Sequence, residues 1–250
     1  MRILLTNDDG ISSPHLQAFA DRLNRDHDVW VFAPDKEQSA CSHSITLMGP
    51  LIVEEKAEKQ YACSGTPADC VLLALQGYIN KEFDLVISGI NKGPNLGTDI
   101  VYSGTAAGAR QGAIMGKPAF AVSTNSKDTL ADISYQIEFL CHNMENLNSI
   151  WKTGCFININ FPQICSNKTQ VELTFPCNRV YNDKLTRFSA PDGKTYCFFN
   201  GEIASAKEKG SDYYAVEAQN ISISLISVHP THIDVSELFH TLSFRKGENA

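Results

Sequence analysis

Apolar positions in the first two thirds of the chain follow two alternating patterns. Short continuous apolar runs, such as residues 3–6 and 29–33, are typical of strands buried on both faces of a sheet. Between these runs, residues 15–25 place apolar side chains at helical spacing, which predicts an amphipathic helix. Further strands are predicted at residues 61–64, 83–88, 119–123 and 155–161, and further helices at residues 66–78, 105–115 and 128–148. This alternation predicts an α/β fold whose mainly parallel sheet is covered on both faces.

Two shorter segments carry local signals. Residues 66–69 (Thr-Pro-Ala-Asp) have the composition of a helix start, with a threonine cap, a proline at the first helical position and an acid in the first turn. Residues 45–47 and 51–53 flank a Gly-Pro pair, so we expect them to form a small hairpin.

The pattern becomes β-rich after about residue 166. Predicted strands lie at residues 171–175, 179–181, 196–199 and 221–228, with turns between them. We therefore divide the chain into an α/β core, residues 1–165, and a β-rich arm, residues 166–250. An arm of this kind cannot bury both faces on a core that helices already cover. We expect it to pack partly on another subunit, in a homodimer or a homotetramer.

Net charge and hydropathy indicate which classes of partner to expect for this protein. A formal net charge of −7 argues against a nucleic-acid-binding protein, which usually needs a basic face. No apolar run approaches the roughly 18 residues of a membrane helix, so we expect no membrane partner. The first residues lead directly into a predicted strand, without the core of a signal peptide. The eight cysteines form no C-x-x-C pair, and we interpret them as reduced, mostly buried thiols of a cytoplasmic protein.

Candidate chemistry gathers in the loops that follow the strands. In a sheet of this kind these loops share the carboxyl edge, where ligands bind. The first loop, Thr6-Asn7-Asp8-Asp9-Gly10, brings two carboxylates together, and they repel each other unless a cation or a proton lies between them. Oxygen ligands at an open edge suit Mg²⁺ or Mn²⁺. A helix cap with one solvated acid explains this loop equally well.

Two further loops offer neutral oxygen ligands. Ser39 follows the second strand, and its hydroxyl can complete the shell of a hard cation, although an ordinary polar loop is the simpler interpretation. Asn91 lies in a loop with three glycines, which favours close approach of the backbone to a ligand. Asn91 can offer its carbonyl oxygen to a metal or its amide to a phosphate, and the alternative is a structural turn.

Ser103, Gly104 and Thr105 open a predicted helix. Backbone amides at a helix start, flanked by two hydroxyl groups, form an anion site. Glycines recur at every fourth position from Gly104 to Gly112, which we interpret as close packing of this helix. His43 is a candidate proton donor, and His229 and His232 form an i, i+3 pair, although each histidine is more simply structural. A hard cation beside an anion cradle indicates phosphoryl chemistry.

These residues resemble the SurE family, the stationary-phase survival proteins that act as 5′-nucleotidases. The matching stretches are RILLTNDDG (2–10), APDKEQS (33–39), HSIT (43–46), GTPADC (65–70) and SGINKGPNLGTDIVYSGT (88–105). The chain departs from the family where Cys41-Ser42 replaces a residue followed by glycine, and where Gln111 replaces a common glutamate. The C-terminal half matches poorly.

The resemblance implies a Rossmann-like core and a C-terminal extension that is exchanged between subunits. It implies one divalent cation per subunit, Mg²⁺ or Mn²⁺, held at Asp8, Asp9, Ser39 and Asn91. Asn95 and residues 103–105 correspond to positions near the phosphate. The implied activity is hydrolysis of nucleoside 5′-monophosphates, often of 3′-monophosphates, and in some members of polyphosphate.

We therefore expect a metal-dependent phosphomonoesterase in which Asp8 and Asp9 are catalytic. They either hold a cation that activates water or attack phosphorus directly, and the sequence leaves both routes open. Two alternatives come from other classes: a nucleotide-binding regulator without turnover, and a glycosyltransferase-like enzyme that uses a metal on a nucleotide-sugar.

Overall fold

The computed structural model describes residues 1–125, 133–205 and 208–230 of the 250-residue chain. The strands are β1 (Arg2–Thr6), β2 (Asp28–Pro34), β3 (Val53–Ala57), β4 (Gln60–Cys63), β5 (Leu85–Lys92), β6 (Ala119–Thr124), β7 (Cys155–Phe161), β8 (Val171–Thr174), β9 (Arg179–Ser189), β10 (Thr195–Ser205) and β11 (Ile221–Ser227). The helices are α1 (Pro14–Leu23), α2 (Pro67–Leu73), the π-helical turn η1 (Ala74–Tyr78), α3 (Asp99–Tyr102), α4 (Gly104–Ile114), α5 (Ser134–Ile150) and α6 (Asp212–Glu217).

Nine of the described strands form one sheet, in the order β3-β4-β2-β1-β5-β6-β7-β11-β8. From β4 to β7 all neighbours pair in parallel, whereas β3 and β11 run antiparallel to β4 and β7. The order reverses around β1, which lies between β2 and β5. The carboxyl ends of β1 and β5 therefore border the crevice where ligands of doubly wound sheets bind.

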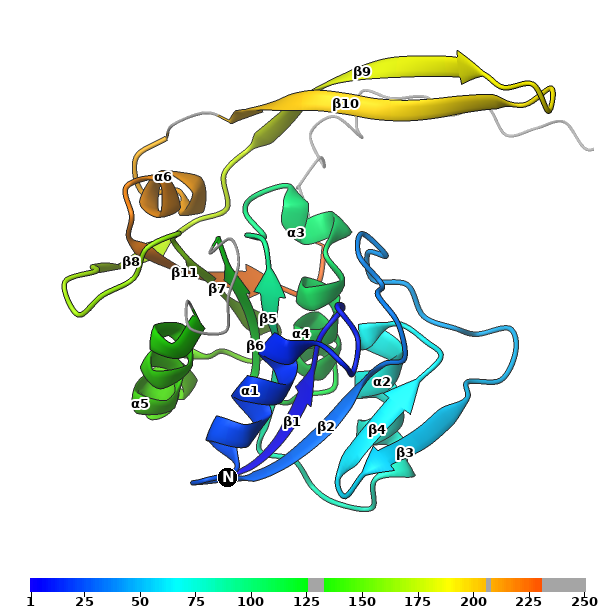
Figure 1. The fold of residues 1–250 in the computed structure, drawn as a ribbon. Helices are drawn as coiled ribbons and strands as arrows, with labels where there is room; N and C mark the ends of the chain where they lie inside the picture. The colour runs from blue at the N-terminus through cyan, green and yellow to red at the C-terminus, as the bar shows by residue number, and fades with distance from the viewer. Residues whose placement is uncertain (126–132, 206–207, 231–250) are drawn as a thin grey trace, which may run out of the picture.

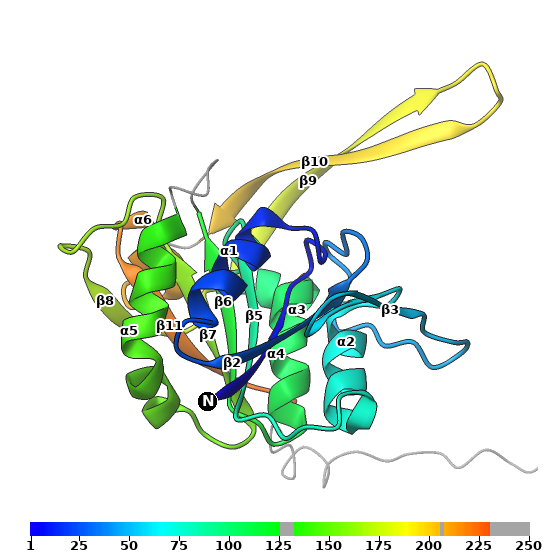
Figure 2. The same cartoon turned by 60° about the horizontal axis from the view of Figure 1, so that its bottom comes forward.

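Helices cover both faces of this sheet (Figures 1 and 2). On one face, Leu16 and Phe19 of α1 and Ile137 and Leu140 of α5 pack into one apolar cluster with the strands. On the other face, α2 and α4 contribute Val71, Ala106 and others to a second cluster. Because the strands are buried on both sides, their continuous apolar runs are explained. The predicted Rossmann-like α/β fold is confirmed.

Helix α4 packs closely on the sheet because its glycines lack side chains. A Cβ atom at Gly108 would lie 2.8 Å from Ser88 Oγ, and one at Gly112 would lie 2.8 Å from Val86 Cβ. Both distances are shorter than those that Cβ atoms adopt in contacts with other atoms. The recurrence of glycine at every fourth position therefore marks a tight contact between α4 and the sheet.

Most predicted elements are present with shifted ends, but the hairpin expected at residues 45–53 is wrong. Residues 45–52 form no strand, and the hairpin lies further along, between β3 and β4. The prediction of a turn rested on the Gly-Pro pair. The strands instead form where the Tyr61 ring packs on Trp30 and Phe32 of β2. The helix predicted at 128–148 begins at Ser134 in the described residues, and its expected start lies outside them.

The segment after residue 166 divides between two sheets. Strands β8 and β11 join the central sheet, whereas β9 and β10 pair only with each other over eleven residues. Figures 1 and 2 show this hairpin projecting away from the core. It exposes apolar side chains, including Phe188, Phe198 and Phe199, the last with 75% of its surface accessible.

Candidate active site at the carboxyl edge of the sheet

The loop after β1 is fixed by its own hydrogen bonds. The Asn7 side chain accepts a bond from the Gly10 amide at 3.2 Å and donates to the Gly10 carbonyl at 3.1 Å. Gly10 has a φ of 100°, a conformation that suits glycine. The Gln38 amide donates to the Asp8 carbonyl oxygen at 2.8 Å, which ties the loop after β2 to the loop after β1. Asp8 and Ser39 are thereby brought to one edge of the sheet.

Asp8 is a buried carboxylate, with 5% of its surface exposed. Thr105 Oγ1 donates to its Oδ1 atom at 2.5 Å. Burial raises the pKa of Asp8, and the hydrogen bond from Thr105 opposes that shift. Gly104 allows α4 to approach, since a Cβ atom there would lie 2.8 Å from Asp8 Cβ. The first turn of α4 therefore lies directly against this carboxylate.

Asp9 lies beside a second source of negative charge. Burial, and then the charges of Asp8 and Glu37, raise the pKa of Asp9 to about 6, while Lys92 acts in the opposite direction. The two neighbouring acids are thus hard to ionise together without a cation.

A cleft of about 280 Å³ brings most of the predicted residues together. Asp8, Ser39, Asn91, Asn95 and Ser103 all line it. Asn91 lies at the end of β5, and the others lie in the loops after β1, β2 and β5 and at the N-cap of α4. Asp9 does not line this cleft, and Gly104 and Thr105 lie behind it, against Asp8.

The donor set at this cleft fits a hard divalent cation. Asn91 Nδ2 donates to the Gly93 carbonyl at 2.8 Å, which leaves the side-chain carbonyl oxygen as its group for a ligand. Asp8 keeps its second carboxylate oxygen, and Ser39 offers a hydroxyl whose proton is donated to Glu37. Within the described part of the chain, no three His, Cys, Asp or Glu side chains cluster as a metal site. The Asp8 carboxylate with a hydroxyl and an amide oxygen, and with Asp9 next to Asp8 in the chain, favours Mg²⁺ or Mn²⁺ over zinc.

The start of α4 offers donors for an anion. Ser103 is the N-cap, and its Oγ accepts the Ala106 amide at 2.9 Å. The first amides of a helix have no partner within the helix. Both the hydroxyl and the backbone amide of Thr105 bond to Asp8, so of the first two amides of α4 that of Gly104 is the one left to meet an anion.

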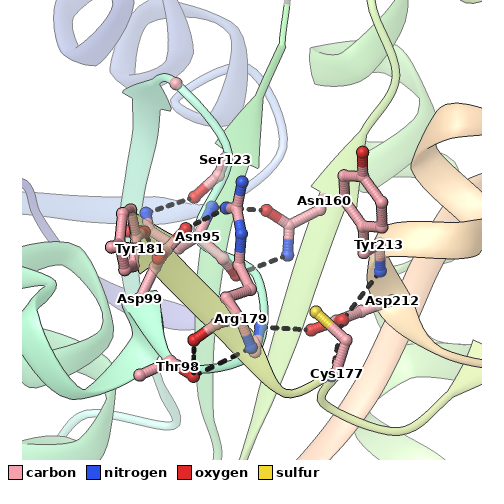
Figure 3. Close-up of polar contacts among 12 residues, drawn as sticks. Asn95, Thr98, Asp99, Ser123, Asn160, Cys177, Arg179, Tyr181, Asp212 and Tyr213 are labelled. Atoms are coloured by element: carbon pink, nitrogen blue, oxygen red, sulfur yellow. Dashed lines mark hydrogen bonds and ion pairs between the residues drawn. The ribbon is translucent and has the colours of Figure 1, made fainter. Parts of the chain in front are cut away.

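Asn95 is held in position by hydrogen bonds to buried polar side chains (Figure 3). Its Nδ2 donates to Ser123 Oγ at 2.8 Å, and its backbone amide donates to Asn160 Oδ1 at 2.8 Å. The side chains of Asn158 and Asn160 both donate to its carbonyl oxygen. These supports were not predicted from the sequence, although polar residues at alternate positions of the apolar strand β7 are a visible signal.

Two further residues of the cleft were also missed. Asp99 follows the glycine-rich loop, and Tyr181 comes from β9 of the projecting hairpin. Nothing in the local sequence links these residues, because they are 82 positions apart.

His43 lies outside the cleft. Its Nε2 atom bonds to Gln111 Oε1 at 2.9 Å. His232 lies outside the described residues, so the expected pair with His229 has no description. Ser42, where the resemblance led us to expect glycine, adopts a φ of 55° and donates hydrogen bonds to the carbonyls of Val101 and Tyr102.

The fold and the cleft define a class: a doubly wound α/β protein with paired carboxylates and a helix N-terminus at its switch point. The family described as "Survival protein SurE" matches residues 3–183. The chain belongs to the SurE family.

Similar proteins cover nearly the whole chain. A protein of Syntrophomonas wolfei named 5′-nucleotidase SurE is 38% identical over 98% of this chain and 94% of its own length. Another of that name, from Kosmotoga olearia, is 40% identical over 93% of this chain and 94% of its own length. The crystal structure of the SurE protein from Aquifex aeolicus matches with a TM-score of 0.78 and 31% identity, covering 97% of this chain and 98% of that one.

Proposed function

We propose that this protein is a metal-dependent phosphomonoesterase that hydrolyses nucleoside 5′-monophosphates to nucleoside and phosphate. One observation carries the proposal: Asp8, Ser39 and Asn91 line the same cleft as Asn95 and the N-cap of α4. Oxygen ligands and anion donors in one cleft are what phosphate-ester hydrolysis requires. Curated relatives named 5′-nucleotidase SurE, similar over nearly the full chain, support the same activity.

The proposed cation site consists of Asp8, Asp9, Ser39 and Asn91. A bound Mg²⁺ or Mn²⁺ supplies Lewis acidity and lowers the pKa of water. Asp8 is oriented for this role by Thr105, which holds one of its oxygens. The raised pKa values of both acids support a cation between them, because a positive charge would favour their ionised forms.

The proposed phosphate site consists of Asn95, Ser103, Gly104 and Thr105. Ser103 lines the cleft, Gly104 and Thr105 lie behind it against Asp8, and the dipole of α4 adds to the attraction for an anion. Asn95 contributes its side-chain amide, which Ser123 holds in position. These groups donate hydrogen bonds that strengthen as charge develops on the phosphate oxygens.

The wider scope is also part of the proposal. We infer activity on 3′-monophosphates and short polyphosphate, and a homodimer or homotetramer in which the β9–β10 hairpin of the arm is exchanged between subunits. The exposed apolar side chains of the β9–β10 hairpin support an interface there. No helix in the described residues has the length and apolar character to cross a membrane. All eight cysteines are free thiols, which supports the proposed cytoplasmic location.

Phosphate release tests the activity. The purified protein, with Mg²⁺ or Mn²⁺ and then with a chelator, is given AMP, 3′-AMP, short polyphosphate and a nucleotide-sugar. We expect metal-dependent phosphate release from AMP. Binding of AMP without turnover would favour a regulator, and release of a nucleoside diphosphate from the nucleotide-sugar would favour the transferase; either result contradicts the proposal.

A further inference from the structure

Tyr181 gives the cleft an aromatic wall that comes from the arm rather than from the core. It lies on β9, at the base of the projecting hairpin, and 38% of its surface is exposed. It lines the same cleft as Asp8, Asn91 and Asn95. The cleft thus combines an acidic, oxygen-rich part with an aromatic surface.

Contacts with two charged neighbours fix this ring in position (Figure 3). The Tyr181 hydroxyl donates to Asp99 Oδ1, and Arg179 donates to the other oxygen of the same carboxylate. The Arg179 guanidinium carbon lies 6.0 Å from the centre of the Tyr181 ring and 5.6 Å from that of Tyr213. Because its hydroxyl is already bonded to Asp99, what Tyr181 offers a ligand is its ring.

The support under Asp99 is itself rigid. Arg179 is 8% exposed, and its backbone exchanges hydrogen bonds of 3.1 Å with Thr98 Oγ1. The buried carboxylate of Asp212 accepts the amides of Gly97 and Cys177, at 2.7 and 2.9 Å. These bonds join the loop that carries Asn95 to the base of the hairpin, so the ring and the proposed phosphate site keep a fixed relation.

We infer that Tyr181 stacks on the nucleobase of the substrate and makes the enzyme prefer nucleotides over phosphate esters without a base. This inference rests on the proposed nucleotidase function. Aromatic rings hold bases by their π-faces, which every base has, so this contact accepts purines and pyrimidines alike. Tyr181 is therefore a specificity-determining residue that discriminates by the presence of a base and little by its identity.

The experiment compares AMP with ribose 5-phosphate, which has the same phosphate and sugar but no base. The ratio of kcat/KM for the two substrates is measured in the wild-type protein and in Tyr181→Leu, Tyr181→Phe and Tyr196→Leu. Loss of stacking should lower the AMP preference roughly tenfold or more in Tyr181→Leu, mainly through KM for AMP. Tyr181→Phe keeps a ring and should retain most of the preference.

Tyr196→Leu is the matched control. Tyr196 lies on β10 of the same hairpin, is 46% exposed and does not line the cleft. Tyr196→Leu should leave the ratio of kcat/KM values unchanged. This result would distinguish loss of the Tyr181 ring from a general disturbance of the hairpin. An unchanged ratio in Tyr181→Leu would overturn the inference. Tyr102 also lines the cleft. If Tyr102→Leu lost the preference for AMP while Tyr181→Leu kept it, the inference would be overturned as well.

Equilibrium binding keeps this test independent of turnover. Calorimetry with AMP and ribose 5-phosphate, run on the same variants, measures the contribution of the base directly. If the wild-type protein hydrolyses neither compound, the proposed function fails, but tighter binding of AMP that disappears in Tyr181→Leu would still support the aromatic wall. Equal affinity of the wild-type protein for the two compounds would contradict it.

Discussion

Asp8 and Asp9 are the residues on which the proposed chemistry depends most. Replacing either with asparagine keeps the shape but removes a charge from the cation site. We expect a loss of at least about a hundredfold in kcat, the scale of a metal Lewis acid. We expect metal binding to the native state to raise the melting temperature of the wild-type protein, and we expect each variant to lose that rise. Wild-type turnover and metal response in both variants would show that the site lies elsewhere.

The pKa of Asp9 predicts a pH effect on the metal-free protein. Its folded-state pKa is raised from 3.8 to about 6, so the folded chain holds the proton more tightly than the unfolded chain. The contribution of Asp9 to the free energy of unfolding is fully present below about pH 4, and it is lost as the pH rises through about 6. The melting temperatures of the wild-type protein and of Asp9→Asn, both measured with chelator, should diverge across this pH window. The melting temperature of the variant should fall less as the pH rises. Parallel curves would contradict the shift.

His43 is expected to remain neutral at pH 7. Burial lowers its pKa below 6.5, and the hydrogen bond to Gln111 opposes this only partly. Gln111→Glu would place a carboxylate beside the ring and should raise the His43 pKa. An NMR titration of the imidazole measures both values. A wild-type pKa at or above 6.5 would restore His43 as a candidate proton donor.

Among the elements, α4 links the fold to the site. Gly104→Ala would place a Cβ atom 2.8 Å from Asp8 Cβ and 3.0 Å from its Oδ2, so Asp8 must shift. We expect strong loss of activity and of metal-induced stabilisation. Gly108→Ala is the matched control, since its Cβ would meet Ser88 and Thr6 rather than Asp8.

The two α4 variants separate packing from chemistry. Gly108→Ala should lower the melting temperature but keep the metal-induced rise, whereas Gly104→Ala should lose that rise. If both variants respond equally to Mn²⁺ in thermal melts, the contact between α4 and Asp8 does not govern metal binding.

At the scale of the whole molecule, the β9–β10 hairpin is the feature that the isolated chain does not explain. It exposes Phe188, Phe198 and Phe199 far from the core. We expect these rings to be buried between subunits, because exposed apolar patches of this kind mark interfaces. Replacing Phe198 and Phe199 with serine should reduce the dimer or tetramer to smaller species in light scattering at micromolar concentration. A wild-type monomer under those conditions would contradict the expectation.

The sequence by itself determined most of the strands and helices of the core, because apolar periodicity reflects burial directly, but not the β3–β4 hairpin or α3. It also determined the start of α2, where Thr66 is the predicted cap and forms a capping box with Asp69, and the positions of Asp8, Ser39 and Asn91 near strand ends. These features depend on residues that are neighbours in the chain. Their physical causes, local hydrogen bonds and the regular geometry of parallel strands, can be inferred from short segments.

Only the tertiary structure decided which distant residues meet. Thr105 turned out to hold Asp8 rather than face the cleft, because the glycines of α4 let the helix approach β1. Tyr181 joined the cleft through Asp99, and Asn160 came to support Asn95 from a neighbouring strand. Contacts between residues 65 to 97 positions apart depend on the packing of whole elements. The free energy of that packing is a sum over the entire core, and no local pattern in the chain records it.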